Sequence, residues 1–329
     1  MATPHQSDPV ITALHALAPG AGLVSHEMVR ANGRRLRWVE TTKDTGGPTV
    51  VFTAGAGDTV LDWAAVLPAL ADEFHVVAYD RAGLGASDPQ RRLTIPNQVD
   101  DLVALLDQQR GPVLLAGHSW GGLLAEFATA ARPDAVQGLV LIDATHEEVM
   151  AAVPVNLRIA SDLMLNWMVV LKSLGLFQKQ LTQHARAFAV RCTDDPEIQG
   201  LLTGAYLHSY ASRGQVAAIR AENRLASRVA EARRTRAAMT LPDLPVTVLT
   251  ATSGKPPKLQ ALSAELADQT AAGYPRGTHI VVDDSGHYIH QDQPAATVAA
   301  IKATAGQLPS VQGGGDQGDD QPETPQPSR

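Results

Sequence analysis

Short apolar segments alternate with longer segments of helical periodicity along most of the chain. Apolar, β-branched runs predict strands at residues 35–40, 49–53, 76–79, 113–116, 138–142, 246–250 and 278–282. Apolar spacings of three and four residues predict helices at 60–71, 96–110, 120–131, 256–272 and 294–306. Strands that are apolar throughout and separated by helices indicate a mainly parallel sheet covered on both faces. We therefore predict an α/β fold with a doubly wound sheet, whose ligands bind beyond the carboxyl ends of the strands.

About a hundred residues between Asp143 and Val246 interrupt this alternation. Helical patterns fit 156–177, 178–192, 196–212 and 215–238, so the segment is too long and too regular for a loop. We predict a helical cap over residues 146–239, inserted into a core formed by 25–145 and 240–306. Residues 1–24, rich in Ala, Pro and Gly, and the acidic tail 307–329 are expected to be flexible.

Composition and charge exclude several classes of protein. The 27 basic and 34 acidic residues give a net charge of −7, which argues against a nucleic-acid partner. The chain lacks an apolar run of about 18 residues, so we expect no membrane span. The single cysteine, Cys192, excludes an internal disulfide. The first apolar run follows no Lys or Arg, unlike a secretory signal, so we expect a cytoplasmic protein. The oligomeric state is left open.

The sharpest motif is the segment 117–122, GHSWGG, which has the spacing G-x-S-x-G between a predicted strand and a predicted helix. A serine on such a tight turn has a strained backbone and an exposed hydroxyl, and a Cβ at Gly117 or Gly121 would clash with nearby backbone. The first amides of the following helix are unpaired. We therefore predict that Ser119 is a nucleophile and that the Trp120 amide binds an oxyanion. An ordinary glycine-rich turn is the structural alternative.

A serine nucleophile needs a general base. His287 follows the last predicted strand and precedes the final helix, which places it at the same sheet edge as Ser119. We predict that His287 is the base and keep His290 as its rival. His118, inside the motif, is expected to be structural.

The base needs a carboxylate partner, and the chain order for this arrangement is Ser, acid, His. No acid stands between residue 251 and Glu265, whereas Asp143 lies directly at the end of strand 138–142. We therefore predict Asp143 as the acid. Asp283 and Asp284 are too near His287 along the chain. A helix-capping role is the alternative for Asp143.

These motifs resemble those of α/β-hydrolase-fold serine hydrolases over about residues 25–306. The segment 52–58 (FTAGAGD) resembles the loop that usually reads H-G-x-x-x, and 79–87 (YDRAGLGAS) resembles the D-x-x-G-x-G-x-S turn. The ending SGH at 285–287, followed by QP, resembles the histidine loop. By position in this resemblance, the Ala56 amide is the second oxyanion donor. Ala54 replaces the usual histidine, and an acid at Asp143 is the less common of two family locations.

The resemblance implies hydrolysis of a carboxylic ester of a small apolar molecule through an acyl-enzyme. It implies no cofactor, and the His and acid spacings suggest no metal site. A serine at the nucleophile position argues against epoxide hydrolases and haloalkane dehalogenases, which use aspartate. The apolar start of the insertion either packs on the core or lines the substrate pocket. Pocket candidates are Trp120, Met164, Trp167 and Met168.

Other functions are also compatible with the sequence. An acyltransferase or a cofactor-free perhydrolase could use the same serine, histidine and acid. A small-ligand receptor could be built on the same scaffold. The weakest alternative is a dinucleotide site at Gly55-x-Gly57 with Asp80, because Val60 stands where the third glycine is needed.

Overall fold

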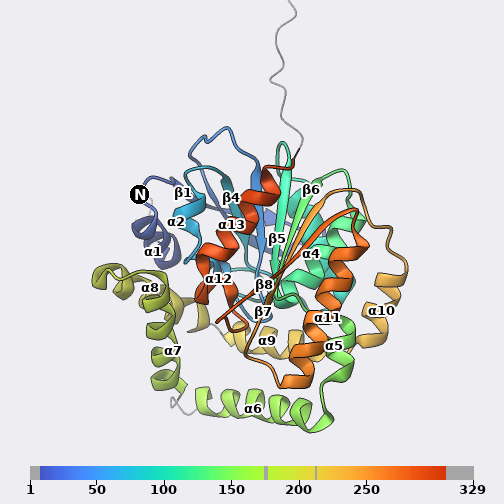
Figure 1. The fold of residues 1–329 in the computed structure, drawn as a ribbon. Helices are drawn as coiled ribbons and strands as arrows, with labels where there is room; N and C mark the ends of the chain where they lie inside the picture. The colour runs from blue at the N-terminus through green and yellow to red at the C-terminus, as the bar shows by residue number, and fades with distance from the viewer. Residues whose placement is uncertain (1–7, 174–176, 212, 309–329) are drawn as a thin grey trace, which may run out of the picture.

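The computed structural model describes residues 8–173, 177–211 and 213–308, which contain an eight-stranded sheet (Figure 1). The strand order is β1-β2-β4-β3-β5-β6-β7-β8. Strand β2 runs in the direction opposite to the other strands of this sheet. The strands are β1 (Leu23–Val29), β2 (Arg35–Thr41), β3 (Thr49–Thr53), β4 (His75–Tyr79), β5 (Val113–His118), β6 (Val136–Ile142), β7 (Pro245–Ala251) and β8 (Arg276–Val282). The predicted α/β class is confirmed.

Alternate residues of the central strands pack into two cores, one on each face of the sheet. In β3, Val50 and Phe52 join one core and Val51 joins the other, as the two-residue period of a strand requires. The first core receives side chains from α1 (Pro9–Leu17), α2 (Leu67–Leu70), α12 (Ile289–Asp292) and α13 (Pro294–Ala305). The second receives side chains from α3 (Ile95–Leu106), α4 (Ser119–Ala131) and α11 (Pro257–Gly273).

Two elements of the core differ from the sequence prediction. The helix expected at 60–71 is a 3₁₀ turn, η1 (Val60–Trp63), followed by the short α2. Pro68 lies in the first turn of α2 and lacks the N–H that a continuous helix would need. Strand β1 was not predicted, because as an edge strand it is largely exposed and lacks an apolar run.

Residues 9–17 form the helix α1 and β1 begins at Leu23, where we expected a loose chain up to residue 24. The Asp8 carboxylate accepts a hydrogen bond from the Val10 amide (2.9 Å) and caps α1. Val10, Ala13 and Leu14 are buried. Residues 1–7 and 309–329 lie outside the described ranges, so the expected flexibility of the tail stays a prediction.

The insertion after β6 is helical, as expected. It contains α5 (Glu147–Ala152), α6 (Val155–Ser173), α7 (Phe177–Cys192), α8 (Pro196–Ala211), α9 (Arg213–Leu225) and α10 (Val229–Ala237). Figure 1 shows α6 and α9 beneath the sheet, with α7 and α8 rising beside it. The helix expected at 215–238 is divided, because α9 packs on α6 and α8 whereas α10 packs on α5. Within the described ranges, every helix falls short of the length or apolarity that a membrane crossing requires.

Candidate active site

The chain turns directly from β5 into α4 at Ser119, which has a left-handed backbone conformation (φ +51°). A Cβ on Gly117 would lie 2.7 Å from the Gly121 carbonyl oxygen, and one on Gly121 would lie 2.2 Å from that of Thr53. Both glycines are therefore required by close backbone approach, as the sequence indicated. The half-buried Ser119 lies at the amino end of α4.

The structure brings together the three residues predicted as nucleophile, base and acid. His287 Nε2 lies 2.8 Å from Ser119 Oγ, and His287 Nδ1 lies 2.5 Å from Asp143 Oδ2. With Nδ1–H donating to the carboxylate, Nε2 accepts the serine hydroxyl. The Asp143 side chain is 2% exposed and that of His287 is 31% exposed. This is the arrangement that nucleophilic catalysis by serine requires.

Asp143 has a second partner that the sequence did not predict. Lys255 Nζ lies 2.5 Å from Asp143 Oδ2, and the Ala251 amide reaches Oδ1 at 3.4 Å. Burial opposes ionisation of Asp143, but the hydrogen bond from His287 and the charge of Lys255 outweigh it and lower its pKa. Lys255 follows β7. This is the more common of the two places where the family carries its acid.

His287 is tuned toward its neutral form. Burial is the largest cause and lowers the pKa, the hydrogen bond to Asp143 raises it, and nearby His118 and Lys255 lower it further. The net effect is a pKa below the ordinary histidine value. A neutral imidazole can accept the serine proton at neutral pH.

The predicted oxyanion donors lie on neighbouring segments at one edge of the sheet, Ala56 in a loop and Trp120 at the start of α4. Strands β3 and β5 are paired with Thr53 opposite Gly117, so the oxyanion loop, residues 54–58, runs beside the Ser119 turn. Trp120 is the second residue of α4, where the backbone N–H has no intrahelical partner. The positions of Ala56 and Trp120 are thus compatible with both backbone amides donating hydrogen bonds to the same oxyanion.

Ala54 stands where the usual histidine is missing, and a buried arginine, Arg81, contacts the oxyanion loop. The Arg81 guanidinium donates to the carbonyl oxygens of Ala54 and Gly55, both at 2.5 Å. It also donates to Glu222 on cap helix α9 at 2.7 Å and 2.9 Å. Burial opposes the charge of Arg81, but Glu222 outweighs it and raises the arginine pKa.

Glu222 connects α9 to the oxyanion loop directly and to Trp120 through Gln98. Its Oε2 accepts the Gly57 amide at 2.7 Å, and its Oε1 accepts Gln98 Nε2 at 2.7 Å. Gln98 Oε1 in turn accepts the indole N–H of Trp120 at 2.9 Å. Sequence reasoning missed Glu222, because nothing in the spacing of α9 marks it.

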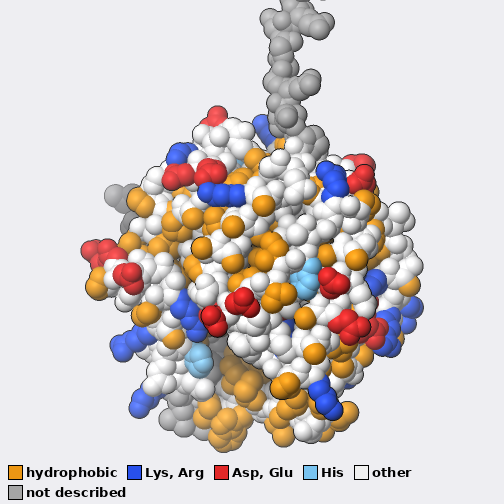
Figure 2. All heavy atoms as spheres, viewed as in Figure 1, with side chains coloured by type: hydrophobic (Ala, Val, Ile, Leu, Met, Phe, Trp, Pro, Cys, Tyr) orange, Lys and Arg blue, Asp and Glu red, His pale blue; other side chains and the backbone are white. Residues whose placement is uncertain are grey.

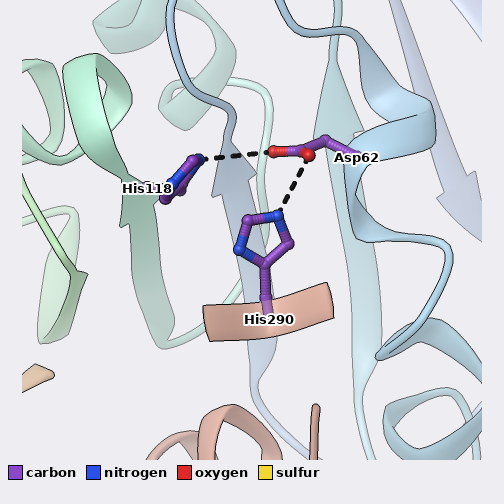
Figure 3. Close-up of side chains that lie close together, drawn as sticks. All are labelled: Asp62, His118 and His290. Carbon is purple, nitrogen blue, oxygen red and sulfur yellow. Dashed lines mark ion pairs between the residues drawn. The ribbon is translucent and has the colours of Figure 1, made fainter. Parts of the chain in front are cut away.

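A second imidazole–carboxylate cluster, formed by Asp62, His118 and His290 (Figure 3), lies beside His287. Asp62 lies between His290 Nε2 at 3.0 Å and His118 Nδ1 at 3.6 Å, and all three are buried. The spacing of histidines and acids along the chain indicates no metal site, yet in the described ranges these three residues bring potential ligand atoms within 4.8 Å of one another. Asp62 Oδ1 also accepts Gln291 Nε2 at 2.6 Å. Burial opposes ionisation of Asp62, but the neighbouring His290 and His118 outweigh it and lower its pKa.

The cluster also places the rival histidine. His290 is paired with Asp62 and packs on Trp63, with ring centroids 4.7 Å apart. His118, expected to be structural, contacts the ring of His287 at 4.8 Å and its backbone oxygen at 3.0 Å. In the described part of the chain, His287 is the histidine whose ring lies within hydrogen-bond distance of Ser119.

A cavity of about 220 Å³ opens between the oxyanion loop and cap helices α7 and α8. None of the four predicted pocket residues lines it. Trp120 is 2% exposed and packs in the core, while Met164 and Trp167 are 58% and 59% exposed on α6. Figure 2 shows apolar side chains gathered at the lower end of the molecule, where Figure 1 places α6. Met168, on the same helix, is half-buried.

Comparisons with known proteins agree with this architecture. The model of the alpha/beta hydrolase family matches residues 50–301. The soluble epoxide hydrolase of a Corynebacterium species is 32% identical over 36% of this chain and 42% of its own length. Lipase LipV of Mycobacterium tuberculosis is 47% identical over 22% of this chain and 28% of its own length. The chain thus spans about two fifths or less of these curated relatives.

Among solved structures, Cfl2 of Burkholderia cenocepacia superposes with a TM-score of 0.64 at 25% identity. The match covers 85% of this chain and 95% of Cfl2. A match over this share of both chains supports a shared fold.

Proposed function

Because the chain belongs to the alpha/beta hydrolase family, we propose that it hydrolyses a carboxylic ester through an acyl-enzyme on Ser119. The observation that carries this proposal is the continuous chain of hydrogen bonds from Ser119 through His287 to Asp143. The similarity to an epoxide hydrolase covers 36% of the chain. It does not outweigh a serine at the position where those enzymes use aspartate.

In the first half of the reaction, Ser119 Oγ attacks the ester carbonyl carbon and its proton passes to His287 Nε2. The negative charge that develops on the carbonyl oxygen is stabilised by the amides of Trp120 and Ala56. Asp143 stabilises the imidazolium. When the intermediate collapses, the carbon–oxygen bond to the alcohol breaks, and the alcohol leaves with the proton from His287.

In the second half, water replaces the alcohol. His287 Nε2 takes one proton from the water while its oxygen attacks the acyl carbon. The bond to Ser119 Oγ then breaks, and Ser119 recovers the proton from His287. The products are a carboxylic acid and the free enzyme, so the cycle requires no cofactor.

A labelling experiment tests the nucleophile. A serine-directed fluorophosphonate is expected to modify Ser119 in the wild type, as identified by peptide mass spectrometry, and to leave Ser119→Ala unmodified. Ser119→Ala is also expected to lose p-nitrophenyl ester hydrolysis while it keeps the wild-type circular dichroism spectrum. Labelling of another serine, or hydrolysis by Ser119→Ala, would exclude the proposal. Hydrolysis with added alcohol or peroxide separates transfer to water from transfer to other acceptors.

A further inference from the structure

The cavity beside the oxyanion loop contains a carboxylate with little to neutralise it. Asp58 follows Gly57 at the end of that loop and lines the cavity. Its Oδ2 is buried with no hydrogen-bond partner. Its Oδ1 receives one long hydrogen bond, from the Tyr210 hydroxyl at 3.4 Å. Oδ1 is therefore available to a donor that enters the cavity.

The other charged groups of the cavity wall already have partners. Arg191 donates to Gln291 at 3.1 Å and lies 3.9 Å from Asp292. His184 Nδ1 lies 2.9 Å from the Gln180 carbonyl oxygen. Asp62 is shared between His118 and His290, as described above. Among the charged side chains that line the cavity in the described part of the chain, Asp58 stands out, because its one hydrogen bond comes from an uncharged hydroxyl.

Aromatic rings form much of the remaining wall. Tyr206 and Tyr210 stack with centroids 4.4 Å apart, and Phe188 contacts Tyr206 at 5.4 Å. Tyr288 also lines the cavity and lies against the ring of His287 at 5.6 Å. The ring of Tyr288 therefore connects the cavity wall to the catalytic histidine.

We propose, building on the ester hydrolysis proposed above, that this cavity binds an ammonium group of the substrate. A carboxylate supplies the opposite charge, and the faces of tyrosine rings attract a cation that has lost part of its water. The volume of about 220 Å³ is sufficient for a trimethylammonium-sized group. The cavity would thus select esters that carry a positive charge near the scissile bond.

The titration of Asp58 provides a signature of this binding. Burial is the main cause that raises the pKa of Asp58 in the free protein. Asp62 and Glu222 raise it further, and the charge of Arg81 and the Tyr210 hydroxyl oppose them. A bound cation favours the ionised form and lowers that pKa, so binding releases a proton. The ammonium affinity is therefore expected to increase as pH rises through the pKa of Asp58.

Binding is tested without turnover in the full-length Ser119→Ala variant. The probes are choline and 3,3-dimethyl-1-butanol, which have the same shape and differ in charge. Calorimetry is expected to show about tenfold tighter binding of choline. Asp58→Asn is expected to reduce the preference to within about twofold, whereas Asp134→Asn, an exposed residue at the other edge of the sheet, is expected to retain it.

A second variant keeps the test independent of the folding of Asp58→Asn. Tyr206→Leu retains the carboxylate and removes one aromatic face, so it is expected to lower the choline preference. Equal affinity for both probes in the Ser119→Ala protein, or tighter binding of a carboxylate such as pivalate, would overturn the proposal.

Kinetics then separate this proposal from the proposed function. In otherwise wild-type protein, acetylcholine is expected to exceed 3,3-dimethylbutyl acetate in kcat/KM by about tenfold, and Asp58→Asn removes the difference. Hydrolysis of both esters at equal rates would refute the ammonium site and keep the esterase. Choline binding without hydrolysis of any ester would refute the esterase and keep the site.

Discussion

The buried ion pair between Arg81 and Glu222 gives the most quantitative prediction. Glu222 accepts four hydrogen bonds, two on each carboxylate oxygen, and its side chain is fully buried. In Glu222→Gln one oxygen becomes an NH₂ group. The two N–H groups that donate to that oxygen in the wild type then face a donor instead of an acceptor. The substitution also leaves the Arg81 guanidinium buried without its counter-charge.

Breaking a buried pair from one side costs about 3–5 kcal/mol. An unfolding entropy of about 2.1 cal/mol/K per residue gives about 0.6 kcal/mol/K for a domain of about 300 residues. The expected fall in Tm is therefore about 5–8 °C, measured by differential scanning calorimetry. Glu148→Gln removes the exposed partner of Arg233 and serves as the matched control, with an unchanged Tm expected.

The same variant also tests the position of the oxyanion loop. Glu222 accepts the Gly57 amide, so its loss frees the loop that carries the Ala56 amide. We expect kcat of Glu222→Gln to fall more than KM rises, because the oxyanion exists in the transition state and not in the bound ester. A Tm within 1 °C of wild type, or a change confined to KM, would refute the reasoning.

Three further predictions concern the reaction itself. Asp143→Asn is expected to reduce kcat by up to about four orders of magnitude, and the exposed Glu265→Gln to change it little. Because burial lowers the pKa of His287 and the base must be neutral, kcat/KM is expected to rise with pH and to reach half its maximum below 6.5; a flat profile between pH 5 and 8 would contradict this. Dialysis against EDTA is expected to leave hydrolysis unchanged, whereas a loss restored by zinc would assign a metal to Asp62, His118 and His290.

The sequence determined the features that depend on neighbouring residues. The G-x-S-x-G spacing fixes a turn whose geometry is set within a few residues, so Ser119 and its flanking glycines could be identified directly. Apolar runs gave the strands, because strands buried on both faces have no polar alternation. The carboxyl ends of parallel strands lie at one edge of the sheet. His287 and Asp143 each follow such a strand end, which made them candidates for the base and the acid.

Some local predictions failed where tertiary contacts outweighed composition. Residues 9–17 look like a loose Ala- and Pro-rich segment, but α1 buries three apolar side chains against the core and packs on α8. The exposed edge strand β1 has no apolar pattern and is held by its backbone pairing with β2. The four pocket candidates were chosen for their apolarity, which does not specify which side of a helix faces the core.

Only the tertiary structure decided how the cap meets the core. Glu222 is 165 residues from Gly57 in the sequence, and Tyr210 is 152 residues from Asp58. No periodicity relates such positions, because their approach depends on how α8 and α9 pack over the oxyanion loop. A buried carboxylate in the cap, Glu222, and a carboxylate in the cavity, Asp58, look like ordinary surface acids in the sequence. Burial, which only the fold determines, gives them their energetic weight.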